Sequence, residues 1–402
     1  MKLYSIFFLM LSACISSAQK YTSYSNAIAL NLYSEALRDS VNIDIFVPND
    51  IEEKASSEFP VIYLLDKQLN QNYQYNIATI DYLSTLQWMP KAVVVGISFP
   101  WKVRDKWTTP NASGGNADDL ISFMENELNA YLKNLYTISN FNLLIGHSRT
   151  AIFSSYALSK KPYFFNGAIA SSVSNFDFGN EYQKEVFDNF LKTIPSFANT
   201  FFYYYSVGEL AYGDLHEPAV DTLNAYLESI SLPSNFQWKN YKHKVAHKLT
   251  PGVTVSTALS DIFKDYGIRI NQCFDIAKAS PNTFPEEEFT NYYSSLSTVL
   301  GFEIQPSKYF FNSIGSEYFF DHNGTYGENN LDFALKILFM AIEKYPSDFS
   351  YYSWIGEIYA AQHLLDKRDE YLNKAIKLIQ EDTSLSTEER EMYLEEIEEL
   401  RK

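Results

Sequence analysis

The sequence predicts an α/β protein with a doubly wound, mostly parallel sheet, followed by an all-helical tail. Three observations carry this prediction. Apolar runs alternate with helix-like segments over about residues 25–268, the tail repeats a pattern after 34 residues, and the chain of 402 residues is long enough for two domains. Strand–helix alternation is typical of a parallel sheet covered by helices on both faces. With 46% apolar residues, the chain can bury a substantial core.

Strands are expected where short apolar runs end at turn residues. Residues 92–97 form a continuous apolar run, as in a strand buried on both faces, and residues 165–170 are expected to form another buried strand. Residues 41–47 alternate and stop at Pro48. The expected strands are residues 41–47, 60–65, 92–97, 141–145, 165–170, 200–207 and 236–241. Between them, apolar residues at helical spacing predict helices at residues 120–135, 152–158, 219–230 and 254–266.

The tail repeats itself. Ala334-x3-Leu338-x2-Ala341 matches Arg368-x3-Leu372-x2-Ala375, and each stretch follows a helix that carries Ile-Gly-x2-Tyr. A 34-residue helix-turn-helix period resembles the tetratricopeptide repeat. Two repeats are few for a free-standing array, so we expect packing on the first domain or a cap formed by the last helix, residues 387–401. The predicted divisions are residues 19–268 for the α/β domain, 269–306 for a helical linker and 307–402 for the repeats.

The N-terminus resembles a targeting segment. Lys2 is followed by an apolar stretch and then small residues, which is a signal-peptide layout spanning residues 1–18. Cleavage after Ala18 competes with a lipoprotein signal that ends before Cys14 and would leave Cys14 as a lipid anchor. Either outcome predicts a secreted or periplasmic protein, the second an outer-membrane lipoprotein. Cys273 is then left without a partner and is expected to be a small buried hydrophobe.

Charge and composition exclude several classes of function. The formal net charge of −17 argues against nucleic-acid binding, because an acidic surface repels phosphate. No Cys/His cluster has the spacing of a zinc site, and nothing in the sequence calls for a metal or another cofactor.

A nucleophile is expected at Ser148. The stretch Gly146-His147-Ser148-Arg149-Thr150-Ala151 lies between an expected strand and an expected helix. A sharp turn in that context lifts a serine hydroxyl off the end of the sheet, and the helix N-terminus behind it offers amide donors to an oxyanion. The motif departs from G-x-S-x-G at Thr150.

The base must follow the serine in the chain, and elimination leaves His247. His147 is expected to point away from its neighbour Ser148, His243 lies inside the last strand, and the others lie in the repeats or where an acid belongs. His247 directly follows the last strand and precedes the closing helix, so its loop can lean over the nucleophile.

The acid stays open among three residues of the loop after the aromatic strand. Glu209 is the first choice, Asp214 is the alternative, and Glu217 is also available. The oxyanion donors expected are the backbone N–H groups of Arg149 and Lys67.

Several motifs in this order resemble one known family. They are Phe59-Pro-Val-Ile-Tyr-Leu-Leu-Asp66, Val93-Val-Val-Gly96, Arg104-Asp105-x4-Pro110, Gly114-Gly115-x7-Phe123-x3-Glu127-Leu128, Gly146-His-Ser148 and Val207-Gly208-Glu209. Over roughly residues 27–268 the chain is similar to the putative esterase family of α/β-hydrolases, which includes feruloyl and siderophore esterases. The resemblance implies an α/β-hydrolase fold and a small-molecule, siderophore or other acyl ester substrate. A tail resembling tetratricopeptide repeats is often joined to this domain in secreted bacterial proteins.

The chain departs from that family at three places. Thr150-Ala151 stands where Gly-Gly is usual, Lys67 stands where Gly is usual, and Ala211 occupies the usual position of the acid. The resemblance therefore also leaves open a Ser–His dyad without an acid, as in some siderophore esterases of the family.

Two functions follow from these observations. The first is an extracytoplasmic serine esterase, in which Ser148 attacks an ester carbonyl with His247 as general base and an acyl-enzyme forms. The second is a weak or inactive hydrolase-fold protein that binds a protein partner through its repeat tail.

Overall fold

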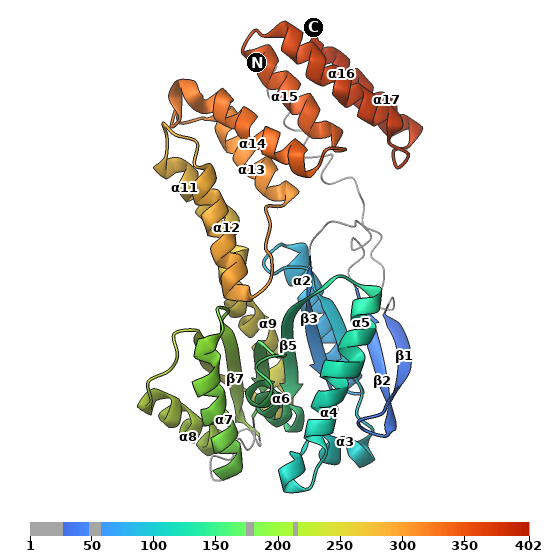
Figure 1. The fold of residues 1–402 in the computed structure, drawn as a ribbon, viewed down its shortest axis with the longest axis vertical. Helices are drawn as coiled ribbons and strands as arrows, with labels where there is room; N and C mark the ends of the chain where they lie inside the picture. Colours follow the sequence, from blue (N-terminus) through green and yellow to red (C-terminus); the bar gives the residue numbers. More distant parts are fainter. Residues whose placement is uncertain (1–26, 48–57, 174–180, 212–215, 402) are drawn as a thin grey trace. The chain divides into compact units, whose positions relative to one another are not determined.

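A computed structural model describes residues 27–47, 58–173, 181–211 and 216–401 (Figure 1). The targeting segment, with Cys14 and Ala18, lies outside the described residues. The chain divides into two compact units: Met1–Lys264 with Leu300–Phe302, and Asp265–Val299 with Glu303–Lys402.

The first unit contains a sheet with the strand order β1-β2-β4-β3-β5-β6-β7-β8. β1 and β2 pair in an antiparallel manner, as do β2 and β4, and every other neighbouring pair is parallel. The strands are β1 (Ile28–Ser34), β2 (Asp39–Phe46), β3 (Phe59–Leu65), β4 (Val93–Ile97), β5 (Ile138–His147), β6 (Gly167–Ser171), β7 (Phe201–Leu210) and β8 (Phe236–Ala246). All seven strands expected from the sequence are present, and β1 is the addition.

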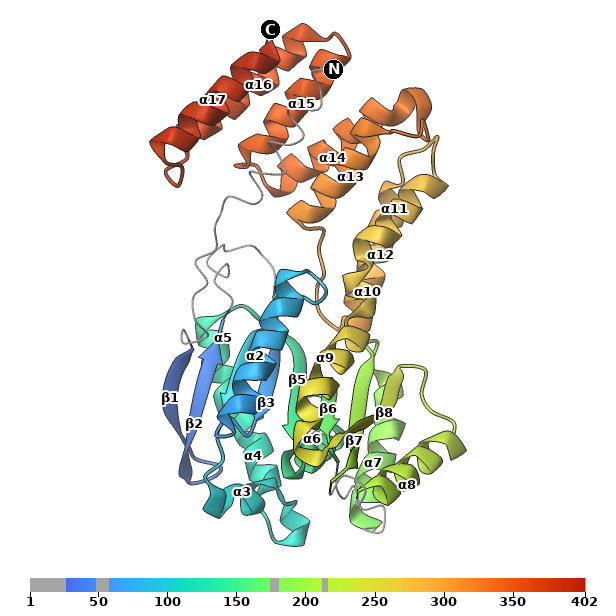
Figure 2. The ribbon, with the colours of Figure 1, turned by 180° about the vertical axis from the view of Figure 1, so that it is seen from behind.

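Helices cover both faces of this sheet. Helices α2 and α9 pack together on one face, with α9 against β6 and β7 (Figure 2). Helices α4, α6 and α7 lie on the other face, which Figure 1 shows. The helices of this unit are α2 (Asn70–Thr85), α3 (Trp101–Thr108), α4 (Ala117–Ser122), α5 (Asn129–Leu135), α6 (Arg149–Lys160), α7 (Glu181–Thr193), α8 (Glu217–Ser229) and α9 (Thr250–Ile262).

Buried side chains explain why the apolar runs form central strands. Every residue of β4 and β6 is buried, and so are six of the seven residues of β3, because helices cover both faces there. The helix expected at residues 120–135 forms as α4, a π-helical turn at Phe123–Leu128 and α5. In that turn Glu127 accepts hydrogen bonds from Ser34 Oγ and from the backbone amides of Glu35 and Ala36. The carboxylate therefore secures the turn between β1 and β2, which gives this motif residue a structural role.

The second unit is entirely helical in its described part. Its helices are α10 (Lys264–Gly267, which begins at the last residue of the first unit), α11 (Arg269–Ala279), α12 (Glu286–Leu300), α13 (Lys308–Phe320), α14 (Asn330–Lys344), α15 (Phe349–Ala361), α16 (Leu365–Glu381) and α17 (Thr387–Arg401). Consecutive helices pack as the pairs α13 with α14 and α15 with α16. Gly356 is needed in α15, because a Cβ there would lie 2.5 Å from Leu372 of α16. Cys273 is buried and burial raises its pKa to about 12, in agreement with the expected inert thiol.

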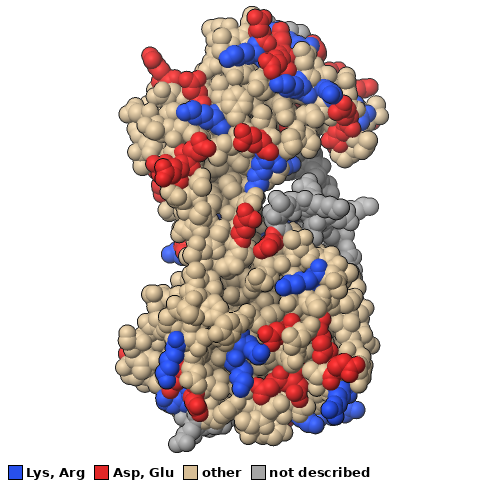
Figure 3. All heavy atoms as spheres, in the orientation of Figure 1, with Lys and Arg blue, Asp and Glu red and all other residues tan. Residues whose placement is uncertain are grey.

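Charges of both signs are interspersed on the described face of the molecule that Figure 3 shows, without an extended basic area there. A face without an extended basic area agrees with the net charge of −17. Among the described residues, no helix is both long and apolar enough to cross a membrane.

Candidate active site

The carboxyl ends of the parallel strands meet at one edge of the sheet. Residues just beyond four of these strands adopt a left-handed backbone conformation although none is glycine: Asp66, Ser148, Ser172 and Ala211, with φ of 63°, 57°, 50° and 40°. Each such residue costs on the order of 1–3 kcal/mol, and such residues cluster at functional sites. The edge of the sheet is also where ligands bind in open α/β folds.

Ser148 occupies the sharp turn between β5 and α6. Its φ and ψ are 57° and −113°, and its amide donates to the Ser171 carbonyl oxygen at 2.9 Å, which ties the turn to β6. Gly146 allows α6 to approach closely, because a Cβ there would lie 2.3 Å from the Thr150 carbonyl oxygen. The strand, sharp turn and helix expected around Ser148 are therefore all present.

Thr150, where the motif departs from G-x-S-x-G, is fully buried in this turn. Its hydroxyl accepts from the His147 amide at 2.9 Å and lies 2.8 Å from Asp66 Oδ2, so the hydroxyl has its hydrogen-bond partners inside the protein.

Three hydrogen bonds hold the loop of His247. The His247 carbonyl oxygen accepts from His147 Nε2 at 3.1 Å, from Ser172 Oγ at 3.2 Å and from Thr250 Oγ1 at 2.9 Å. Because a carbonyl oxygen only accepts, His147 carries its proton on Nε2. His147 thus contacts the loop of His247, a contact that no local sequence pattern predicted.

Three imidazole rings lie side by side. The His247 ring centroid is 5.0 Å from that of His147 and 4.9 Å from that of His216. The structure therefore brings His247 next to the residue that precedes Ser148. Among the described side chains, no hydrogen bond joins Ser148 Oγ to His247. From the sequence, His216 was excluded as the base. The only indication that it lies near His247 was its position in the loop after the aromatic strand.

The environment lowers the pKa of His247 and of His147. Burial, followed by the neighbouring charges of His147 and His216, lowers the pKa of His247 to about 4. Burial also lowers the pKa of His147, against an opposing effect of its hydrogen bond to the His247 carbonyl oxygen. A neutral His247 is the form that accepts a proton.

Neither of the two described acid candidates accepts a hydrogen bond from His247 Nδ1. Glu209 is at the end of β7, and its charge raises the pKa of His243, whose overall shift is downward because of burial. Glu217 begins α8 and pairs with Lys242 at 2.8 Å. Asp214 lies outside the described residues. Among those that are described, no group accepts a hydrogen bond from the buried His247 Nδ1.

The two expected oxyanion donors differ in their surroundings. Arg149 begins α6, and its side chain turns toward α3, where it contacts Thr108 and Thr109. The Lys67 amide donates to the Ile97 carbonyl oxygen at 3.0 Å, and its ammonium group lies 2.5 Å from Asp44. The Arg149 amide is therefore placed at the helix N-terminus, whereas the Lys67 amide already has an acceptor.

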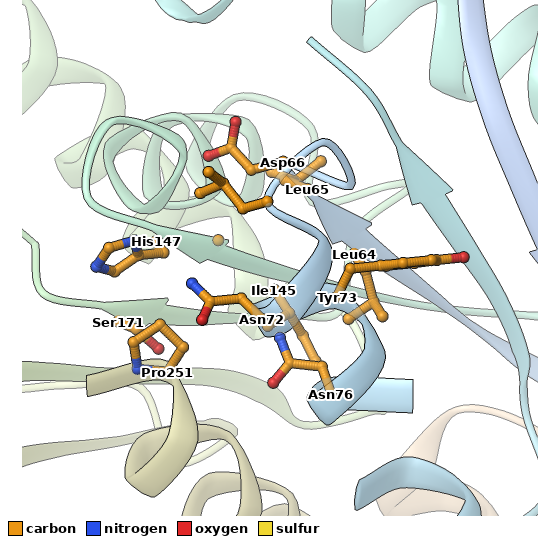
Figure 4. A pocket seen from close by; sticks show the side chains of 12 residues that line it. Leu64, Leu65, Asp66, Asn72, Tyr73, Asn76, Ile145, His147, Ser171 and Pro251 are labelled. Carbon is orange, nitrogen blue, oxygen red and sulfur yellow. The ribbon is translucent and has the colours of Figure 1, made fainter. Parts of the chain in front are cut away.

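A small polar cavity of about 20 Å³ lies at this edge of the sheet (Figure 4). That volume holds roughly one water molecule. Ser171 Oγ and Asn76 Oδ1 are buried without hydrogen-bond partners among the described residues and belong to residues that line the cavity. The lining residues are Leu64, Leu65, Asp66, Leu69, Asn72, Tyr73, Asn76, Ile145, Gly146, His147, Ser171 and Pro251. In the described part of the chain, no cluster of three or more His, Cys, Asp or Glu residues could hold a metal ion.

The sheet order and the serine turn define an α/β-hydrolase fold. The sequence profile of the putative esterase family matches residues 34–252, which is more than half of the chain. The chain therefore belongs to the putative esterase family. No curated protein matches it.

Three solved structures with the same fold share less than a quarter of their residues with this chain. An IroE-like serine hydrolase from Shewanella oneidensis is 18% identical with a TM-score of 0.58, over 78% of this chain and 98% of that one. An uncharacterised protein from Capnocytophaga ochracea is 17% identical with a TM-score of 0.62, over 94% and 99% of the two chains. The BES protein from Bacillus cereus is 20% identical with a TM-score of 0.52, over 60% and 97%.

Proposed function

We propose that the protein is an extracytoplasmic serine esterase with Ser148 as nucleophile and His247 as general base. The observation that carries the proposal is Ser148 at the start of α6, whose φ is 57°. The His247 loop lies at the same edge of the sheet and carries an imidazole with a lowered pKa. The family and the fold of the IroE-like serine hydrolase support hydrolysis of an ester.

The chemistry follows the acyl-enzyme route. Ser148 Oγ attacks the ester carbonyl carbon while His247 takes the hydroxyl proton, and this proton then goes to the departing alcohol oxygen. Water, deprotonated by His247, attacks the acyl-enzyme, and the bond to Ser148 Oγ breaks as His247 returns the proton to this oxygen, which releases the carboxylic acid and restores the free serine. The amide of Arg149 stabilises the oxyanion, because the N-terminus of α6 presents amide donors. The Lys67 amide can also donate to the oxyanion only if it shares or gives up its hydrogen bond to the Ile97 carbonyl oxygen.

The proposed site operates as a dyad unless Asp214 completes it. His247 Nδ1 has no acceptor among the described residues, and Glu209 acts on His243 instead. The backbone anchoring of His247 by His147, Ser172 and Thr250 supports a dyad, because it holds the loop that carries the imidazole in place without a carboxylate.

The location and the tail complete the proposal. The signal-peptide layout of residues 1–18 supports a periplasmic or secreted protein, with lipidation of Cys14 as the alternative. The helix pairs of the tail, with close packing at Gly356, support tetratricopeptide-like repeats over residues 307–402. Repeats of this kind present surfaces on which a protein partner can bind.

A panel of p-nitrophenyl, feruloyl and catecholate esters tests the esterase. Wild type should hydrolyse at least one ester, and Ser148→Ala should lower kcat by about 10³-fold or more. Ser295→Ala, at an exposed position of α12, is the matched control and should retain full activity. A folded protein that hydrolyses no ester would favour the alternative, a hydrolase-fold binding protein that works through its tail.

A further inference from the structure

The hydroxyl of Thr150 connects two of the strained turns at the sheet edge. It accepts from the His147 amide, and its single proton has two acceptors within reach, Asp66 Oδ2 at 2.8 Å and the His147 carbonyl oxygen at 3.0 Å. The carboxylate is the stronger acceptor because it carries charge. The hydroxyl therefore bridges the Asp66 carboxylate and the backbone directly before Ser148.

Asp66 is a firm anchor for this bridge. Its carboxylate is buried and accepts two hydrogen bonds from Arg104, at 2.6 and 2.5 Å, and one from Gln68 Nε2 at 2.7 Å. Gln68 in turn accepts from the Phe99 amide at 2.8 Å. Bidentate pairing with an arginine fixes the orientation of a carboxylate. The anchor thus joins the ends of β3 and β4 to α3.

We propose that Thr150 is a positioning residue for the nucleophile, and this inference rests on the proposed esterase function. Its hydroxyl is fixed by its hydrogen bond to Asp66, which Arg104 orients, and in turn fixes the position of the His147 amide. This holds the backbone of Ser148 in its left-handed conformation and the His147 ring within reach of the His247 carbonyl oxygen.

The replacement of the small residue of G-x-S-x-G by Thr150 then has a physical explanation. A glycine at position 150 would leave the His147 amide without this acceptor and Asp66 without this donor. The threonine side chain supplies both partners from inside the first turn of α6, so the turn is held by a side chain.

Three substitutions separate the hydroxyl from the shape of the side chain. Thr150→Val keeps the shape and removes the hydroxyl, Thr150→Ser keeps the hydroxyl and removes the methyl group, and Thr150→Ala removes both. We expect Thr150→Val to lower kcat and the rate of inactivation by a fluorophosphonate by about 10- to 100-fold, since a misplacement of about 1 Å costs up to that much. KM should change by less than about threefold, and Thr150→Ser should restore the wild-type rates to within about threefold.

Two results would overturn the inference. Wild-type rates in Thr150→Val would mean that the hydroxyl does not position Ser148, and rates in Thr150→Ser as low as in Thr150→Val would assign the effect to packing. Thr150→Ala, which cannot overpack, replaces the valine variant if that variant does not fold.

Amide hydrogen exchange at His147 tests the same bridge without catalysis. The amide should be protected in wild type and Thr150→Ser and exchange at least tenfold faster in Thr150→Val. Wild-type protein that the fluorophosphonate does not label would refute the proposed esterase, whereas equal exchange of the His147 amide in all variants would refute the bridge itself.

Discussion

The pKa of His247 determines the pH range in which the proposed esterase works. Burial and the neighbouring His147 and His216 lower this pKa to about 4. Only the neutral imidazole accepts the Ser148 proton, so activity should be lost as the pH falls through about 4 instead of through the ordinary value of about 6.5. At pH 5.5 a base of pKa about 4 is about 97% neutral, whereas an ordinary histidine is about 9% neutral. We therefore expect kcat/KM at pH 5.5 to be nearly the value at pH 7.5, where an unperturbed base would lose about tenfold.

The assay is the pH profile of kcat/KM, with p-nitrophenol read at its isosbestic wavelength. Folding must be followed by circular dichroism, because the same lowered pKa makes stability pH-dependent. The unfolded chain binds a proton on His247 between about pH 6.5 and 4 that the folded chain does not, so stability should fall as the pH decreases across this window. His216→Asn should move the half-maximal pH upward, since it removes a neighbouring positive charge. A half-maximal pH near 6.5 in folded wild-type protein would refute the assignment of the half-buried His247 as base.

Three further substitutions test the site. Gly146→Ala should destabilise by about 1–3 kcal/mol in urea unfolding and stop fluorophosphonate labelling, because the added Cβ meets the Thr150 carbonyl oxygen; unchanged labelling would contradict this close contact. Arg104→Met should lower the free energy of unfolding by about 3–5 kcal/mol, because it leaves the buried Asp66 carboxylate unpaired. The double variant Asp66→Asn/Arg104→Met should recover part of this loss, and an equally unstable double variant would contradict the pairing argument. Glu209→Gln should change kcat/KM by no more than about twofold, and a loss of about 10⁴-fold would instead identify Glu209 as the acid.

The central strands were predictable because burial on both faces leaves a local signal. β4 is a short, wholly apolar run and β6 is apolar up to Ser171, and both strands lie where these runs predicted them. Helix α2 was not predicted, because Asn70–Thr85 is rich in asparagine and tyrosine and has only a weak apolar stripe. Its cover of the sheet comes from tertiary packing against α9, which leaves little trace in the local sequence.

The candidate site could be proposed from the sequence only as far as chain order determines it. Ser148 and His247 follow from the strand–turn–helix context and from the order of nucleophile and base. The contacts of His147 and His216 with His247 depend on how the ends of β5, β7 and β8 meet, which no local pattern specifies. The role of Thr150 depends equally on Asp66, which lies 84 residues away in the chain.

Mass spectrometry of the protein after treatment with a fluorophosphonate at pH 7.5 tests the central claim most directly. The account predicts a single adduct that peptide mapping places on Ser148, with no adduct in Ser148→Ala and a rate at least about 10³-fold lower in His247→Ala. A folded wild-type protein that forms no adduct, or an adduct that persists in Ser148→Ala, would contradict it.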